Sequence, residues 1–138
     1  MMKTVDASPE KLSQVMAAIP KDRPIVMLNM LKFRERALYP DGTSDCSGRE
    51  AYRRYSQVAA KMVAQVGGNP GRWMGAVQGT LIGPDNESWD SILLVEYPSI
   101  QAFKRMLATP EYQACTVHRM AALEDSRLIC TVKSDRAA

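Results

Sequence analysis

Two segments of this 138-residue chain are apolar on both faces of an extended strand. Residues 24–33 read PIVMLNMLKF and residues 89–97 read WDSILLVEY, so apolar side chains occupy odd and even positions alike. A strand with one solvent-exposed face alternates apolar and polar residues, whereas a strand that is covered on both faces does not. The fold must therefore contain a sheet whose two faces are both covered.

The remaining elements follow in an order that predicts the fold class. Apolar residues at helical spacing predict four helices, over 9–19, 48–66, 100–107 and 110–123, and extended patterns predict two further strands, over 72–83 and 126–132. After the first helix, the order strand, helix, strand, strand, helix, strand is that of the ferredoxin-like split βαβ motif. We expect an α+β sandwich with a four-stranded antiparallel sheet, in a domain over 24–133 that follows a helical extension over 1–23.

The helices of this motif lie on one face of the sheet and cannot cover the other. The second apolar face therefore needs cover from outside the domain. A symmetric copy of the same chain provides this cover without any further component. We expect a homodimer that forms through the sheet face.

Charge and cysteine content limit the classes of partner and the location. The chain has 18 basic and 15 acidic residues, and the net charge of +3 arises within residues 32–61. This surplus is too small for a nucleic-acid interface and suits a small anionic ligand better. The longest apolar stretch, residues 25–31, is too short to cross a membrane, and the charged N-terminus is unlike a secretion signal. Three cysteines without a CxxC pair indicate reduced thiols, so we expect a cytoplasmic protein.

The sequence contains no motif that holds a common cofactor or metal. Its single histidine leaves a zinc site without a usual ligand set. There is no GxGxxG segment between a strand and a helix, and no P-loop. We therefore expect neither a metal nor a tightly bound cofactor.

Four stretches between Pro24 and Ile129 resemble a known family. They are PIVMLNMLKF at 24–33, SGREAYRRY at 47–55, the Trp89-Asp90 pair followed by ILLVEYPS, and TPEYQA through HRMAALEDSRLI at 109–129. Together they are similar to the family called domain of unknown function thirteen-thirty, within the dimeric α/β-barrel superfamily. The resemblance implies a dimer whose two sheets face each other as a barrel, with the helices outside. It implies no particular activity, and the helix over 9–19 and the long loop over 34–47 resemble the longer form of the family.

His118 is the first candidate for chemistry. Cys115 lies three residues earlier on the same predicted helix, so the two side chains project from one face. This spacing permits a thiolate and imidazole pair. A small buried cysteine beside a histidine near a helix C-terminus is the structural alternative.

Polar residues in or beside apolar segments are further candidates. Asn29 interrupts the first strand, and a buried amide needs hydrogen-bond partners, either from a loop or from a ligand. Arg34 and Tyr39 belong to the long loop, which has the length of a lid. Lys32, Arg34 and Arg36 at its start are either solvated or arranged to hold a carboxylate or phosphate.

The predicted hairpin over 72–97 offers a different wall for a pocket. A hairpin that is symmetric about Asp85 and Asn86 places Glu96 opposite Gly75. The gap above a strand glycine is filled either by a helix or by a ligand, with Trp73 as its wall. A slip of one residue moves Glu96 to the other face of the sheet.

Three functional interpretations remain open from the sequence. The first is a small-molecule-binding protein of the cofactor-independent oxygenase or isomerase type, acting on an aromatic or anionic substrate. In this interpretation His118 transfers the proton, Asn29 or Arg119 stabilises oxyanion charge, and Trp73, Trp89, Glu96, Arg34 and Tyr39 line the site. The second is a non-catalytic dimeric binding or interaction module. The third, by analogy within the superfamily, is a haem-degrading monooxygenase that uses a helix histidine with asparagine and tryptophan nearby.

Overall fold

A computed structural model describes residues 3–135 of the chain. Its elements are α1 (Pro9–Ala18), β1 (Ile25–Phe33), α2 (Gly48–Gln65), β2 (Asn69–Ala76), β3 (Ser91–Tyr97), α3 (Ile100–Leu107), α4 (Pro110–Ala122) and β4 (Leu123–Val132). The four strands form one antiparallel sheet in the order β2-β3-β1-β4. The α+β fold and the ferredoxin-like order expected from the sequence are confirmed.

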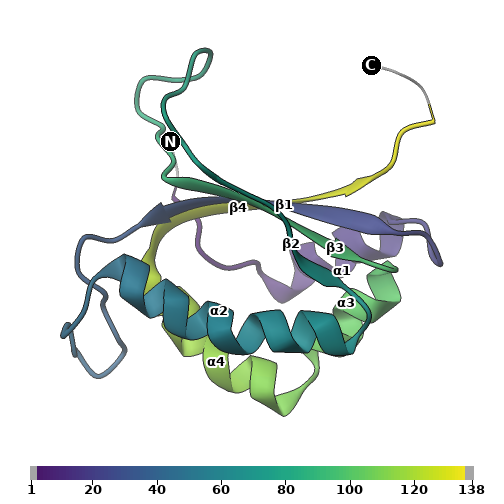
Figure 1. Ribbon diagram of the computed structural model, residues 1–138, viewed down its shortest axis with the longest axis horizontal. Helices are drawn as coiled ribbons and strands as arrows, with labels where there is room; N and C mark the ends of the chain where they lie inside the picture. The colour runs from purple at the N-terminus through teal and green to yellow at the C-terminus, as the bar shows by residue number, and fades with distance from the viewer. Residues whose placement is uncertain (1–2, 136–138) are drawn as a thin grey trace.

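The helices cover one face of this sheet. Figure 1 shows α2 and α4 packed side by side beneath the strands, with α3 and α1 toward one end. Each helix begins where a side-chain oxygen accepts a backbone N–H of the first turn; Ser8, Ser47, Ser99 and Thr109 are the capping residues. All four helices therefore begin at the residues expected from the sequence, which are Pro9, Gly48, Ile100 and Pro110.

The core lies between the sheet and the helices and has two parts. One part joins Met27 and Val95 of the sheet to Phe103 and Met106 of α3. The other part surrounds Leu31 and lies near the start of α2 and the end of α4. Met16 and Ile19 pack against the first part, so the N-terminal helix is docked on the core of the domain.

The opposite face of the sheet carries no helix, and we call it the open face. Alternation along β1 and β3 and their register place five apolar side chains there: Val26, Leu28, Met30, Ile92 and Leu94. All five are half-buried in the single chain. The domain's own helices therefore leave a second apolar face, as the two-faced strands predict.

The hairpin between β2 and β3 differs from the prediction. β2 ends at Ala76, whereas residues 72–83 were expected to form the strand, and a long loop over 77–90 follows. Gly75 pairs with Ile92, and Glu96 pairs with Asn69, so the expected pairing of Glu96 with Gly75 is wrong. The reason is an asymmetric loop, together with a shift of register between Asn69 and Trp73.

The last strand also begins earlier than expected. β4 starts at Leu123, directly after α4, whereas Ser126 was the predicted first residue. Asp125 and Ser126 are buried polar residues at its start, because residues 3–5 lie beside this strand. Buried polar side chains masked the strand pattern in the sequence.

Candidate functional site

A cavity of about 630 Å³ lies between the sheet and the helices. Its walls come from α2, α4, β1 and β3, and residues 4–8 close one side. Residues 3–8 are called the N-terminal segment below. A volume of this size falls within the range of about 300–1,000 Å³ that is typical of small-molecule sites.

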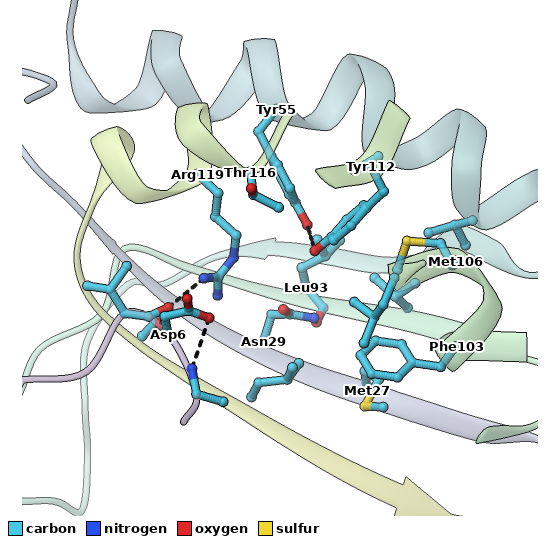
Figure 2. Close-up of a pocket in the computed structure, with 18 of the residues that line it drawn as sticks. Asp6, Met27, Asn29, Tyr55, Leu93, Phe103, Met106, Tyr112, Thr116 and Arg119 are labelled. Atoms are coloured by element: carbon cyan, nitrogen blue, oxygen red, sulfur yellow. Dashed lines mark hydrogen bonds between the residues drawn. The ribbon is translucent and has the colours of Figure 1, made fainter. Parts of the chain in front are cut away.

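The cavity has an apolar end and a polar end. In Figure 2, Met27, Phe103 and Met106 lie at one end, and Arg119 with Asp6 of the N-terminal segment lies at the other. Met27, Phe103 and Met106 are almost fully buried. A molecule that fills the cavity therefore meets hydrocarbon at one end and charge at the other.

A pair of tyrosines stands between the two ends. Tyr55 of α2 and Tyr112 of α4 are hydrogen-bonded through their hydroxyl oxygens, which lie 2.9 Å apart. Burial raises the pKa of Tyr55 well above its usual value, and burial also raises that of Tyr112. Both hydroxyls are therefore neutral at physiological pH. Because one proton suffices for the bond between them, the second is left for another acceptor.

Asn29 faces the cavity from the sheet. Its Nδ2 donates to the carbonyl of Leu93 on the neighbouring strand, at 3.3 Å. This single bond leaves the second N–H and the side-chain oxygen available. The polar residue that interrupts β1 thus lies in the cavity, as its pattern in the sequence suggests.

Arg119 reaches into the polar end from α4. Its Nη1 donates to the backbone carbonyl of Val5 and so ties the N-terminal segment to the helix. The guanidinium also opposes the burial effect by lowering the pKa of Tyr52, Tyr55 and Tyr112. Asn29 and Arg119 are therefore the two predicted catalytic residues that the structure brings to one cavity.

The N-terminal segment is anchored on β4. The carboxylate of Asp125 accepts the N–H of Thr4, and the N–H of Ser126 donates to the carbonyl of Thr4. Burial of Asp125 acts to raise its pKa, but the bonds from Thr4, Arg127 and Ser126 outweigh it and hold the pKa below its usual value. One wall of the cavity thus depends on an ionised carboxylate.

His118 lies outside the cavity. Its Nδ1 is 2.8 Å from the hydroxyl of Tyr39, and Arg54 Nη1 donates to the same hydroxyl at 3.1 Å. Since Tyr39 accepts from Arg54, its proton is available to donate to His118. The histidine therefore helps to hold the long loop over 34–47 against α2 and α4, and the geometry lends no support to its role in proton transfer at the cavity or to the haem interpretation.

Cys115 and His118 form no reactive pair. The thiol of Cys115 donates to the carbonyl of Tyr112, and burial raises its pKa. A raised pKa disfavours the thiolate that nucleophilic chemistry requires. Cys115 is a buried packing residue.

Trp73 and Glu96 do not line the cavity. Trp73 pairs with Leu94 and Glu96 pairs with Val26, which places both on the open face. Trp73 is 60% exposed, and its indole lies over Gly75. Glu96 is 4.0 Å from Arg72. The expectation of a glycine gap lined by Glu96 is therefore wrong.

The other predicted binding residues also lie elsewhere. Trp89 is buried in a smaller hollow between the 77–90 loop and the open face, under the guanidinium of Arg127. Arg34 has a buried Nε without a hydrogen-bond partner, and it does not border the cavity. Lys32 bonds Ser88 and pairs with Glu124. Arg36 bonds the carbonyl of Ser44 within the loop.

Tyr55, Tyr112 and the N-terminal segment belong to the site, although none of them was predicted from the sequence. Tyr55 has a helical period that indicates a core-facing residue, and Tyr112 follows a helix cap, so each reads as packing. The signal that was available is that a buried tyrosine needs a partner for its hydroxyl. Nothing in residues 3–8 signals that they cover a pocket.

Residues 3–135 contain neither a metal-binding cluster nor a membrane-spanning helix. No group of three or more histidine, cysteine, aspartate or glutamate residues within 3–135 is arranged to hold a metal ion. No helix in the same range is both long and apolar enough to cross a membrane.

Comparison with known proteins identifies the family. Residues 42–132 match the family model described as Domain of unknown function (DUF1330). Two crystal structures of the RPA0582 protein are each 38% identical to this chain. The methylated form covers 100% of both chains with a TM-score of 0.91. The other, from Rhodopseudomonas palustris and described as of unknown function, covers 98% of this chain and 100% of its own with a TM-score of 0.87.

More distant structures share only the fold. A hydroxynitrile lyase from Passiflora edulis is 8% identical, with a TM-score of 0.56 over 85% of this chain and 99% of its own. A dabb family protein from Mesorhizobium loti, described as having a ferredoxin-like fold, is 13% identical, with a TM-score of 0.52 over 80% and 97%. No curated protein matches the sequence. Because the family model covers most of the chain and the Rhodopseudomonas protein matches nearly all of it, the chain belongs to the DUF1330 family and has a ferredoxin-like fold.

Proposed function

We propose that the protein binds a small aromatic or anionic molecule in the cavity between the sheet and the helices. The observation that carries this proposal is the hydroxyl pair of Tyr55 and Tyr112 in an otherwise largely apolar cavity. A few polar groups that converge in an apolar space are typical of a ligand site. A cavity filled by side chains would have favoured the interaction module instead.

The same groups suit chemistry that needs no cofactor. Neutral tyrosine hydroxyls, the second N–H of Asn29 and the guanidinium of Arg119 are donors that stabilise negative charge on a ligand oxygen. This is the requirement of an isomerase or oxygenase that passes through an enolate. The non-catalytic alternative predicts binding without turnover.

A thermal-shift screen with aromatic acids and keto acids tests the binding proposal. A ligand at 100 times its dissociation constant stabilises the folded state by about 2.7 kcal/mol. The variant Thr116→Trp places a large side chain on the cavity wall and should abolish the shift. Gln113→Trp adds the same side chain at an exposed position of α4 and should leave it unchanged. A shift that survives Thr116→Trp would contradict the proposal.

We also propose that two copies pair through the open face. Apolar side chains of β1 and β3 lie there without helical cover, and Leu81 and Ile82 of the adjacent loop are fully exposed. A second copy offers the same apolar surface, so that pairing removes the open faces of both copies from water at once. Pairing of this kind also explains why β1 and β3 are apolar on both faces.

The mass in solution tests the pairing. We expect about twice the 15.3 kDa of one chain by light scattering. Leu28→Glu on the open face should give monomers, whereas Val15→Glu, at an exposed position of α1, should not. A wild-type mass of one chain would refute the dimer.

A further inference from the structure

We infer that the ligand of the cavity is a monocarboxylate with an apolar body, bound with its carboxylate at Arg119 and its body toward Phe103 and Met106. This inference rests on the proposed function and deepens it by naming the chemical class and the orientation. It depends on three features of the cavity: the charge of Arg119 at the polar end, the apolar side chains at the opposite end, and the neutral groups between the two ends.

The charge of Arg119 has no carboxylate partner within residues 3–135. Its one hydrogen bond there goes to the carbonyl of Val5, which leaves four of the five N–H donors of the guanidinium. Arg127 also borders the cavity, but its guanidinium pairs with Glu87 and Asp125. Arg119 is therefore the arginine at the cavity with donors to spare, and its planar fork matches a carboxylate.

The acidic residue nearest this end does not take the place of a ligand. Asp6 lines the cavity and is exposed, and its carboxylate accepts the N–H of Ala7 within the N-terminal segment. Figure 2 shows Asp6 and Arg119 at the same end of the cavity, and Arg119 lowers while Asp6 raises the pKa of Tyr112. A ligand carboxylate would be attracted by the guanidinium of Arg119 and repelled only weakly by the exposed carboxylate of Asp6.

The opposite end requires a body without charge. Phe103 is 6% exposed, Met106 2% and Met27 4%, and the two charged residues labelled in Figure 2, Asp6 and Arg119, lie at the other end. Burying a charged group against such surface without a partner is strongly unfavourable. The ligand therefore carries hydrocarbon, aromatic or aliphatic, at this end.

The middle of the cavity offers no partner for a charged group of the ligand. Burial keeps Tyr55 and Tyr112 neutral, and Asn29 is neutral as well. None of these groups balances a second carboxylate. A second carboxylate placed among these groups would be unpaired, whereas a monocarboxylate places its single charge at Arg119; Lys11, a further cation of the lining, is exposed on α1.

Two probes of the same length separate charge recognition from apolar binding. 4-Phenylbutanoate carries the carboxylate, and 4-phenylbutan-1-ol is its neutral counterpart. Calorimetric titration at pH 7.5 and 0.15 M salt should give a dissociation constant for the acid that is about tenfold or more lower than for the alcohol, as expected for charge-assisted hydrogen bonds.

Variants assign this preference to the polar end. Arg119→Met should weaken acid binding by about tenfold and leave alcohol binding within about threefold. Arg119→Lys keeps the charge and should retain part of the preference. Asp6→Asn removes the repelling charge and should strengthen acid binding by about twofold to threefold.

The outcomes distinguish this inference from the proposal on which it rests. Equal affinity for acid and alcohol, in the wild type and in Arg119→Met, would overturn carboxylate recognition and leave binding in the cavity intact. Failure of both probes to bind the folded wild type would overturn both. The comparison of the two probes on the wild type decides the matter even if a variant does not fold.

Discussion

The hydroxyl oxygens of Tyr55 and Tyr112 lie 2.9 Å apart and join α2 to α4 across the cavity. Their rings also meet edge to face, with centroids 6.0 Å apart. The two helices thus share a polar contact at the point where a ligand would pass. This hydrogen bond stabilises the packing of α2 against α4, and the hydroxyl proton that it does not use can be donated to a ligand.

Removal of either hydroxyl should weaken the protein by a modest amount. Tyr55→Phe and Tyr112→Phe each lose one hydrogen bond and leave the other hydroxyl half-satisfied, so each should lower the free energy of unfolding by about 1 kcal/mol. The double variant should cost less than the sum of the two, because no unpaired hydroxyl remains. Urea denaturation of the four proteins measures this coupling, and strict additivity would show that the bond contributes nothing.

Stability should fall in alkaline solution. Burial, only partly opposed by Arg119, raises the pKa of Tyr52 to about 12 from its usual value of 10.0. An acid that is harder to ionise in the folded state stabilises the fold below pH 10, and this contribution is lost as the pH rises from 10 to 12.

The variant Tyr52→Phe isolates this effect. Its unfolding free energy should decline less than that of the wild type, and the difference should reach about 2 kcal/mol at pH 12. The two proteins should show similar pH dependence below pH 9. Parallel curves up to pH 12, measured by denaturation with urea, would contradict the assignment.

The fold was predictable because its strongest signals are local. The helical spacing of apolar residues over 48–66 and 110–123 and the two-faced pattern of β1 each mark an element by themselves. The register of β2 was not predictable, because it depends on a 14-residue loop, residues 77–90, whose shape no turn motif determines. The exact start of β4 depends on residues 3–5, which are more than 100 positions away.

The site was predictable only where a polar residue interrupts an apolar pattern. Asn29 stands out in this way and does face the cavity. His118 drew attention by its rarity, yet the side chain of Arg119, the next residue, projects about 100° away around the helix and reaches a different site. Which side of α4 faces the sheet is decided by tertiary packing. Residues that are adjacent in the sequence can therefore reach different sites.

Substitution of His118 should leave ligand binding intact. His118→Ala and Tyr39→Phe each break the contact between α4 and the long loop, so backbone amides of residues 34–47 should exchange hydrogen faster. Binding of the acid probe in the cavity should change by less than about twofold, because neither residue borders it. A loss of binding as large as that of Arg119→Met would place His118 in the site after all.

The N-terminal segment should loosen in acid. The pKa of Asp125 lies below its usual value of 3.8, because the bonds from Thr4, Arg127 and Ser126 outweigh the effect of burial. Its stabilising contribution is therefore complete above pH 3.8 and is lost as the pH falls through the lower, folded-state value. Asp125→Asn should lower stability by about 1–3 kcal/mol at pH 7 and flatten the decline in acid. Hydrogen exchange at the amide of Thr4 reports the same loss locally, and an unchanged exchange rate in the variant would contradict it.

Gly48 should tolerate no side chain. A Cβ atom at this position would lie 2.1 Å from the carbonyl oxygen of Arg34 and 2.7 Å from that of Ala122, and both are backbone atoms that cannot rotate away. The glycine lets the start of α2 meet the end of β1 and the end of α4, where Gly48 N–H donates to Arg34 and Arg34 N–H donates to Ala122. Gly48→Ala must push these segments apart and should lower the free energy of unfolding by more than about 3 kcal/mol.

Gly79→Ala, with open space around it, is the matched control and should change the free energy of unfolding by less than about 0.5 kcal/mol. Equal urea midpoints for the two variants would show that the three segments are not held as closely as the structure has them.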